Sequence, residues 1–266
     1  MSEALVVVET RGHNARELVR LDADRLRTES EIRSALEQSG RQRVLWIAPD
    51  AAAVKLLLAA FLGRPKGDQR LLALQSANGA RHPLLHAVFR IVVSADEGIR
   101  LLPIDELADV LGSPHRADLF VGGAGAPNDA AVILYRGNLE PLIVPVASFR
   151  TRPGGPKPDL HRLAVTDFGQ TVCLGEYEAA TDAILYEFDG AYRRRAKRRE
   201  LERDSSLGGA LRRLRLQKGL QRTDFRGLTP KEIARIERGE VKKPHARTVA
   251  ILAKRLGVPA KQLATY

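Results

Sequence analysis

The residues with the clearest chemical potential are basic side chains in the last third of the chain. Lys231 and Arg235 lie four positions apart in the segment TPKEIARIERG, a spacing that places both on one face of a helix. Their donors suit the O6 and N7 acceptors of guanine, which an arginine can bind with two hydrogen bonds. Arg238, Lys242 and Lys243 follow directly and suit phosphate oxygens, which position a protein on DNA without specifying its sequence.

A second basic group, RRRAKRR at residues 193–199, separates two parts of the chain with opposite charge. Residues 1–191 hold 21 Lys and Arg against 25 Asp and Glu, a net charge of −4, whereas residues 192–266 hold 22 against 7, a net charge of +15. A compact basic unit is typical of proteins that bind a polyanion. The run could contact DNA, bind RNA, pair with the acidic N-terminal body, or form a solvated connector helix; its cations are Arg193, Arg194, Arg195, Lys197, Arg198 and Arg199.

The elements that position these side chains are predicted to be helices. In the segment 206–219, Leu207, Leu211 and Leu214 recur at helical spacing, and a third helix is expected over HARTVAILAKRLG. Between them, Thr229 is a good N-cap residue and Glu232 completes a capping box. Pro230 fits the first helical position, Ile233, Ile236 and the later Val249, Leu252 and Leu256 point inward, and Gly239 ends the middle helix.

This order of segments resembles the Cro/C1-type (XRE-like) helix-turn-helix DNA-binding family over roughly residues 207–263. The resemblance rests on LRRLRLQKGL, TPKEIARIERGE, a basic turn ending in Pro244, and TVAILAKRLGV, with the core I-x-x-I-E-x-G at residues 233–239 as its most specific part. It implies a small five-helix fold whose recognition helix, residues 229–239, enters the major groove. In that family the residue at Glu237 is usually structural and ties the recognition helix to its neighbours.

The resemblance also implies roles for the polar residues. Arg222 matches the start of the second helix, which usually touches phosphate, and Arg238, Lys242 and Lys243 match the turn that follows the DNA backbone. The outward positions of the recognition helix, which include Ala234, leave base reading to Thr229, Pro230, Lys231, Glu232 and Arg235.

The sequence departs from the family pattern in the second helix. Only QRTDFR lies between Leu220 and Gly227, so this helix is shorter than the family's by about one turn. Phe225 is expected to supply its apolar anchor. The deletion affects the angle at which the recognition helix is presented.

The N-terminal body is predicted to be α+β. For residues 1–111 we expect an α/β domain, with strands at LVVVE, RVLWIAP, RLLALQSA and LLHAVFRIVV and helices at 24–38, 51–62 and 103–111. Residues 116–190 are expected to be β-rich, with a closing helix, and to form either a second domain or one body with the first. A basic linker helix at 191–205 would join this body to the all-α domain 206–266.

Part of the body resembles a bacterial domain of unknown function, numbered 2442. The resemblance covers about residues 130–190 and lies in the order VTDFGQTV, a loop, and ATDAILYE. That family is often found beside toxin–antitoxin modules or fused to helix-turn-helix units, which agrees with a regulatory role. It has no established catalytic residues to transfer.

No segment of the body has a convincing catalytic or metal-binding pattern. Gly122, Gly123 and Gly125 follow a strand without a phosphate-loop lysine, so a plain turn is expected there. His82 and His86 are four residues apart, but Pro83 argues against a helix and hence against a shared metal. Cys173, the single cysteine, is expected to be a buried thiol, and one cysteine excludes an intramolecular disulfide.

These observations favour a cytoplasmic, nucleoid-associated bacterial transcriptional regulator that binds double-stranded DNA as a homodimer. The body would serve dimerisation, sensing of a small-molecule effector, or binding of a partner protein. An antitoxin-like protein that sequesters a partner and autoregulates its operon is the alternative. No enzymatic activity, cofactor, metal or membrane association is expected.

Overall fold

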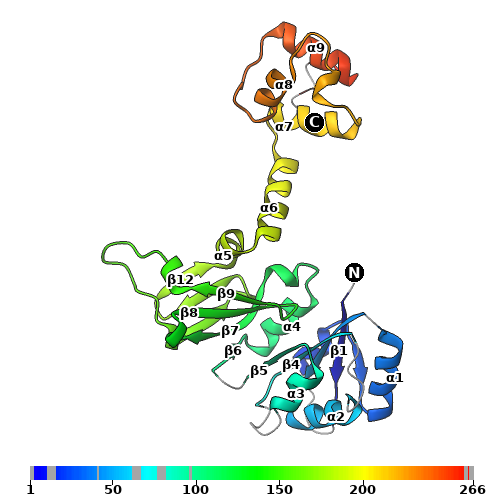
Figure 1. Ribbon diagram of the computed structural model, residues 1–266, viewed down its shortest axis with the longest axis vertical. Helices are drawn as coiled ribbons and strands as arrows, with labels where there is room; N and C mark the ends of the chain where they lie inside the picture. The colour runs from blue at the N-terminus through cyan, green and yellow to red at the C-terminus, as the bar shows by residue number, and fades with distance from the viewer. Residues whose placement is uncertain are drawn as a thin grey trace. The chain divides into compact units, whose positions relative to one another are not determined.

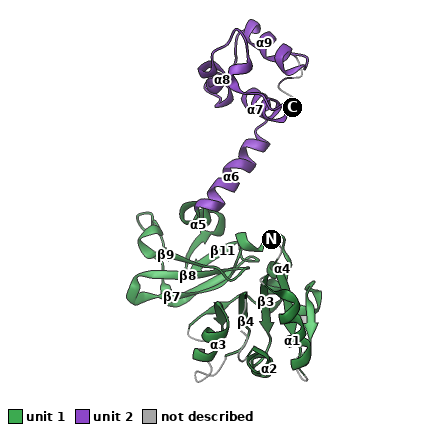
Figure 2. Ribbon diagram, turned by 45° about the vertical axis from the view of Figure 1, so that its right-hand side comes forward, with its two compact units in different colours: residues 1–189 green, residues 190–266 purple. Residues whose placement is uncertain are grey.

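The computed structural model describes residues 3–10, 16–40, 42–61, 67–76, 82–95, 98–260 and 263. The chain divides into two compact units, Met1–Asp189 and Gly190–Tyr266 (Figure 2). The predicted segments 1–111 and 116–190 both lie in the first unit, except that Gly190 begins the second. The predicted fold class, a mixed α+β body followed by a helical C-terminal region, is confirmed.

A parallel sheet forms the first part of unit 1 (Figure 1). Its strand order is β2-β1-β3-β4-β5, with bounds Ala4–Val8 (β1), Asp24–Leu26 (β2), Arg43–Ala48 (β3), Asp68–Ala73 (β4) and Ile91–Ser94 (β5). The helices that alternate with these strands are Glu29–Ser39 (α1), Ala51–Phe61 (α2) and His82–Val88 (α3). The Trp46 and Phe61 rings meet edge to face at 5.3 Å in the core beneath α2.

The predicted helix 24–38 begins too early. Asp24–Leu26 is instead the edge strand β2, which pairs with β1, and the Glu9 N–H donates to the Leu26 carbonyl at 2.8 Å. Helix α1 begins only after the N-cap Thr28, whose side chain forms a capping box with Glu31. These three residues are extended because they pair with β1, which is distant in the sequence. The hydrophobic periodicity of the segment does not reveal this pairing.

The predicted strand at 84–93 is wrong in its first half. Residues 82–88 form α3, and β5 begins at Ile91. Pro83 occupies the first turn of α3, where its missing N–H leaves no helical hydrogen bond unmade. His82 and His86 therefore do share a helix, contrary to the sequence prediction.

The second part of unit 1 holds two antiparallel sheets. One has the order β6-β7-β8-β9 and the other β10-β11-β12. Their strands are Arg100–Leu101 (β6), Phe120–Ala126 (β7), Ala131–Arg136 (β8), Pro141–Pro145 (β9), Leu163–Thr166 (β10), Thr171–Leu174 (β11) and Tyr177–Ala180 (β12). The helices of this part are Ile104–Gly112 (α4) and Thr181–Phe188 (α5).

The glycines expected in a turn lie within β7. A Cβ atom on Gly122 would stand 2.4 Å from the Arg100 carbonyl oxygen, and one on Gly125 would stand 2.2 Å from that of Leu160. Neighbouring backbone therefore packs directly on β7, and only glycine leaves room for it. The prediction of a plain turn at these glycines is therefore wrong. The strand also does not form a phosphate-binding loop.

A buried ion cluster joins the two parts of unit 1. Arg70 on β4 is only 1% exposed and donates to the Asn138 carbonyl oxygen and, at 3.1 Å, to Glu140. Asp68 accepts from the same guanidinium at 2.9 Å. These contacts join the parallel sheet to the loop between β8 and β9. The charges of this cluster therefore have a structural role within unit 1.

Unit 2 consists of helices around a small apolar core. Its helices are Gly190–Arg203 (α6), Leu207–Gln217 (α7), Pro230–Glu237 (α8) and Ala246–Leu256 (α9), with a short 3-10 helix at Arg222–Asp224. The buried core residues are Leu211, Leu214, Phe225, Ile233, Ile236, Leu252, Leu256 and Leu263. The predicted inward positions of α7, α8 and α9 are thus confirmed for all but Leu207 and Val249, which are half-buried against the core.

Candidate nucleic-acid interface

The start of α8 is fixed by its own first-turn residues. The Glu232 N–H donates to Thr229 Oγ1 at 3.2 Å, and Glu232 Oε2 accepts from the Thr229 N–H at 2.7 Å. Pro230 is the first helical residue. The hydrogen bond from the Thr229 amide holds the pKa of the exposed Glu232 carboxyl below its usual value. Thr229 and Glu232, both predicted to read bases, thus also hold the N-terminus of α8.

The opposite face of α8 is buried. Ile233 and Ile236 are 0% and 3% exposed and pack into the core of unit 2. Ala234, which the sequence placed among the outward positions, is buried at 9% exposure, so that assignment is wrong. The apolar stripe is wider than the spacing of the two isoleucines indicated, and it fixes the rotation of α8 about its own axis.

The exposed face of α8 carries Lys231 and Arg235. Arg235 Nε lies 3.3 Å from Glu240 Oε2, and Arg238 Nε lies 2.6 Å from the other oxygen of the same carboxylate. The hydrogen bond from Arg238 lowers the pKa of Glu240. Glu240 therefore gathers two guanidinium groups at the C-terminal end of α8.

A buried carboxylate ties α8 to the preceding elements. Arg215 Nε on α7 donates to Glu237 Oε1 at 2.6 Å, and Arg222 Nη2 donates to Oε2 at 2.7 Å. The Glu237 side chain is 1% exposed. Burial raises its pKa, but the hydrogen bonds and charges of Arg215 and Arg222 outweigh burial and hold the pKa below its usual value.

This network places Arg222, the predicted phosphate contact, beside Glu237. Its side chain remains 41% exposed, and its hydrogen bonds to Glu237 come from Nε and Nη2. Arg215 also donates to the Leu220 carbonyl oxygen at 2.9 Å, which anchors the chain between α7 and the 3-10 helix. The structural role implied for Glu237 agrees with these contacts.

The shortened second helix is a single 3-10 turn, Arg222–Asp224. Gln221 and Asp224 form a capping box around it, and Gly227 follows with a φ of 88°. Phe225 is 1% exposed and lies in the core, as the sequence predicted. The buried ring holds this segment in place although the helix itself is short.

Close contact between α7 and α8 depends on Gly208. A Cβ atom at this position would lie 2.3 Å from the Ile236 carbonyl oxygen. Any side chain there would push α7 away from the C-terminal end of α8. Glycine at position 208 is therefore part of what orients α8.

The remaining predicted contacts lie on the turn after α8 and on α6. Arg238 is the C-cap residue of α8, Gly239 follows with a φ of 72°, and Lys242 and Lys243 are exposed before α9 begins. The six cations of the run 193–199 all lie on α6, a helix with no buried residue. The structure thus brings the α8 residues and the following turn together on one part of unit 2.

Three important residues were missed from the sequence. Gly208, Arg215 and Glu240 each act through a tertiary contact: a close backbone approach, a buried ion pair and a shared carboxylate. Only Gly208 left a trace in the sequence, because a Gly-Gly pair is unfavourable in the first turns of a helix unless packing requires it.

The rest of the described chain offers no competing site of familiar type. Among residues with a described position, no group of three or more His, Cys, Asp or Glu is arranged to hold a metal ion. Cys173 is half-buried rather than buried, and its Sγ lies 3.6 Å from Thr166 Oγ1. No helix in the described ranges is long and apolar enough to cross a membrane.

Comparison with known proteins supports the assignment of unit 2. Residues 206–265 match a family described as "Helix-turn-helix domain". The chain therefore carries a helix-turn-helix domain at residues 206–265, which agrees with the resemblance found in the sequence, and this domain suggests DNA binding. No curated protein and no solved structure matches the chain significantly.

Proposed function

We propose that the protein is a sequence-specific DNA-binding transcriptional regulator that reads the major groove with α8. The observation that carries the proposal is that α8 has one buried face and one exposed, cationic face. Its buried face is locked by Ile233, Ile236 and Glu237, while Lys231 and Arg235 occupy the exposed face of a unit with a net charge of about +15. A helix fixed in this way can present donors to base edges in one register.

The proposal assigns different work to different side chains. Lys231 and Arg235 donate to base edges, with Thr229, Pro230 and Glu232 at the N-terminal end of α8 close to the bases. Arg238, Lys242 and Lys243 contact phosphates, and the partly exposed Arg222 adds one more phosphate contact while it remains bonded to Glu237.

Two copies of the protein bind together in this proposal. A single domain of this size buries little surface on DNA, and two half-sites about one helical turn apart multiply the affinity. Unit 1 supplies dimerisation, effector sensing or partner binding, and we assign no catalytic step to the protein. Binding of chromosomal DNA places it in the cytoplasm with the nucleoid.

The test is genome-wide mapping of bound DNA in the native host, with Lys231→Ala/Arg235→Ala as the comparison. We expect sharp peaks that share a palindromic motif and that disappear in the double variant. A matched variant, Lys254→Ala/Arg247→Ala on α9, removes two cations of the same unit and should keep the motif. Diffuse binding that the α8 substitutions leave unchanged would contradict the proposal.

A further inference from the structure

Helix α6 is an unusual element because it is helical although it contributes no residue to an apolar core. It spans Gly190–Arg203, and none of its 14 residues is buried. A helix of this length is marginal in water unless packing or favourable side-chain pairs support it. Most of its charged pairs at i, i+4 are like-charged and do not supply this support.

The charges of α6 oppose helix formation in two ways. Arg193 and Lys197, Arg194 and Arg198, and Arg195 and Arg199 are like-charged pairs at i, i+4. Three cations, Arg193 to Arg195, lie toward the positive N-terminal end of the helix dipole, whereas the two carboxylates, Glu200 and Glu202, lie toward the negative C-terminal end.

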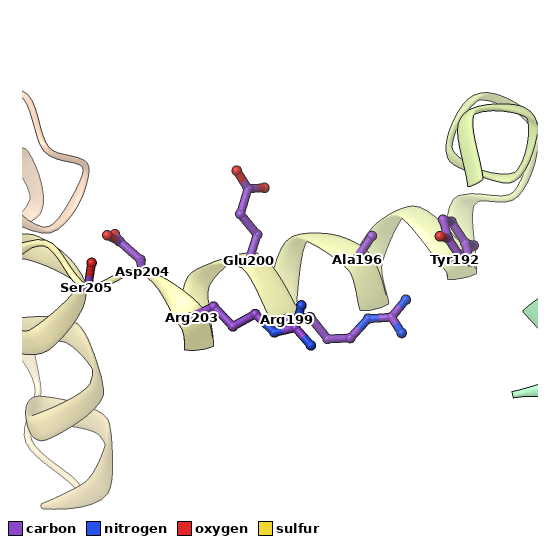
Figure 3. A pocket seen from close by; sticks show the side chains of 7 residues that line it. All are labelled: Tyr192, Ala196, Arg199, Glu200, Arg203, Asp204 and Ser205. Carbon is purple, nitrogen blue, oxygen red and sulfur yellow. The ribbon is translucent and has the colours of Figure 1, made fainter. Parts of the chain in front are cut away.

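The cations of α6 form two faces. The guanidinium groups of Arg195 and Arg199 lie 5.9 Å and 5.7 Å from the centre of the Tyr192 ring, beside a shallow hollow that Tyr192, Ala196, Arg199 and Arg203 line. Figure 3 shows Glu200 projecting away from Arg199 and Arg203. These contacts occupy one side of the helix with intramolecular interactions.

The other face is a stripe of four cations. At 3.6 residues per turn, Arg193, Arg194, Lys197 and Arg198 fall within about 140° of one another around the helix. Arg194, Lys197 and Arg198 are exposed. From Arg193 to Arg198 the stripe rises about 7.5 Å along the helix axis, and one strand of duplex DNA presents a phosphate about every 3.4 Å of axis. The length and charge of the stripe suit two or three consecutive phosphates.

We propose that α6 is a phosphate clamp whose helix is stabilised by DNA: the stripe Arg193–Arg194–Lys197–Arg198 lies against phosphates flanking the site that α8 reads. Phosphates neutralise the like-charged pairs and supply negative charge near the N-terminal end of the helix, so binding and helix formation reinforce each other. This inference rests on the proposed function of unit 2 and adds a second, sequence-independent contact surface to it.

The test uses the full chain, a 30-bp duplex of mixed sequence, and binding measured between about 50 and 200 mM salt. The variant Arg194→Gln/Lys197→Gln/Arg198→Gln should bind at least about tenfold more weakly at 0.1 M salt, with a slope of log affinity against log salt reduced by about 2 to 3. The matched control, Lys218→Gln/Arg247→Gln/Lys254→Gln, removes three exposed cations elsewhere in unit 2. Equal losses in the two variants would overturn the clamp.

Coupling to helix formation has a separate readout. Circular dichroism at 222 nm should show a gain of helix when the duplex is added to the native protein. The gain should be lost in Ala196→Pro, which keeps every charge but breaks α6, and binding should weaken several-fold. An unchanged affinity in Ala196→Pro would show that the helix is irrelevant to the contact.

Two further outcomes separate this inference from the proposed function. Binding to a mixed-sequence duplex does not require base reading. If the α8 substitutions fail to remove the genomic peaks, the clamp can therefore still be tested. If the α6 substitutions fail to weaken mixed-sequence binding, the proposed role of α8 can likewise still be tested. If the α6 variant loses affinity only for a single-stranded RNA of mixed sequence, the surface serves RNA and the clamp on DNA is wrong.

Discussion

Helices α6 and α8 both present exposed cations, yet they differ in how firmly those cations are placed. Helix α8 buries Ile233, Ile236 and Glu237 and is capped at its first turn, so the positions of Lys231 and Arg235 are set by packing. Helix α6 has no buried residue. Reading base edges requires donors fixed to within a fraction of an ångström, whereas holding phosphates requires only charge near the backbone.

The comparison suggests a division of labour between the two helices. In our proposal, α8 supplies sequence preference, and α6 supplies affinity that depends on salt but not on sequence. The substitutions below remove what fixes α8 or what its cations touch, and each should change one of these properties more than the other.

The largest effect is expected from Glu237→Gln. The substitution leaves Arg215 in a buried position without its anionic partner, and breaking such a pair costs about 3 to 5 kcal/mol. Urea unfolding followed by circular dichroism should show the loss in unit 2, and specific DNA binding should fall with it. Glu202→Gln on α6, where no residue is buried, is the matched control and should leave stability within about 0.5 kcal/mol.

The same carboxylate predicts the response to acid. Because the pKa of Glu237 is lowered in the folded protein, its contribution is complete above the ordinary value of 4.5 and declines as the pH falls through the lower folded value. The native unit should therefore lose stability below pH 4.5 more steeply than the Gln variant. Parallel acid profiles for the two proteins would contradict this account of the network.

Gly208→Ala should act on the orientation of α8. The new Cβ would lie 2.3 Å from the Ile236 carbonyl oxygen, so α7 and α8 must separate at a cost of about 1 to 3 kcal/mol. Thermal unfolding measures this cost. Because α6 is unaffected, binding to mixed-sequence duplex at low salt should fall less than binding to the preferred site.

Arg235→Ala and Lys242→Ala should differ in kind. Loss of a base contact costs about 1 to 3 kcal/mol at particular base pairs, whereas loss of a phosphate contact weakens binding to all sequences and lowers the salt slope by about 0.9. Competition binding with a panel of single-base variants of the preferred site distinguishes the two. If both substitutions weaken binding equally at every site of the panel, the assignment of Arg235 as a base-contacting residue is contradicted.

The smallest effect is expected from Glu240→Gln. In the free protein Glu240 holds Arg235 and Arg238, and DNA must compete for the same guanidinium groups. Removing the charge should tighten mixed-sequence binding by about threefold, as expected for exposed ion pairs, and should reduce discrimination between sequences.

The helical unit could be predicted closely because its signals are local. The capping box at Thr229 and Glu232, the glycines at 219, 239 and 257, and the spacing of the isoleucines all act within one helix. The body was predicted less well, because β2 depends on pairing with β1 and because Pro83 is compatible with a first helical turn. Short apolar runs do not reveal such tertiary choices.

The site itself was only partly accessible from the sequence. The spacing of Lys231 and Arg235 placed them on the exposed face of α8, but it did not reveal that Glu240 holds Arg235 or that Arg222 pairs with Glu237. Both contacts join residues that approach only after the helices pack. Burial of Ala234 was missed for the same reason, since it depends on the width of the interface.

The central claim is that α8 reads sequence while α6 adds only phosphate contacts. The most direct test is selection from a randomised duplex library with three full-length proteins: native, Lys231→Ala/Arg235→Ala, and Arg194→Gln/Lys197→Gln/Arg198→Gln. We expect the native protein and the α6 variant to enrich the same motif, the latter with weaker binding, and the α8 variant to lose it. Retention of the motif by the α8 variant, or its loss in the α6 variant alone, would contradict the account.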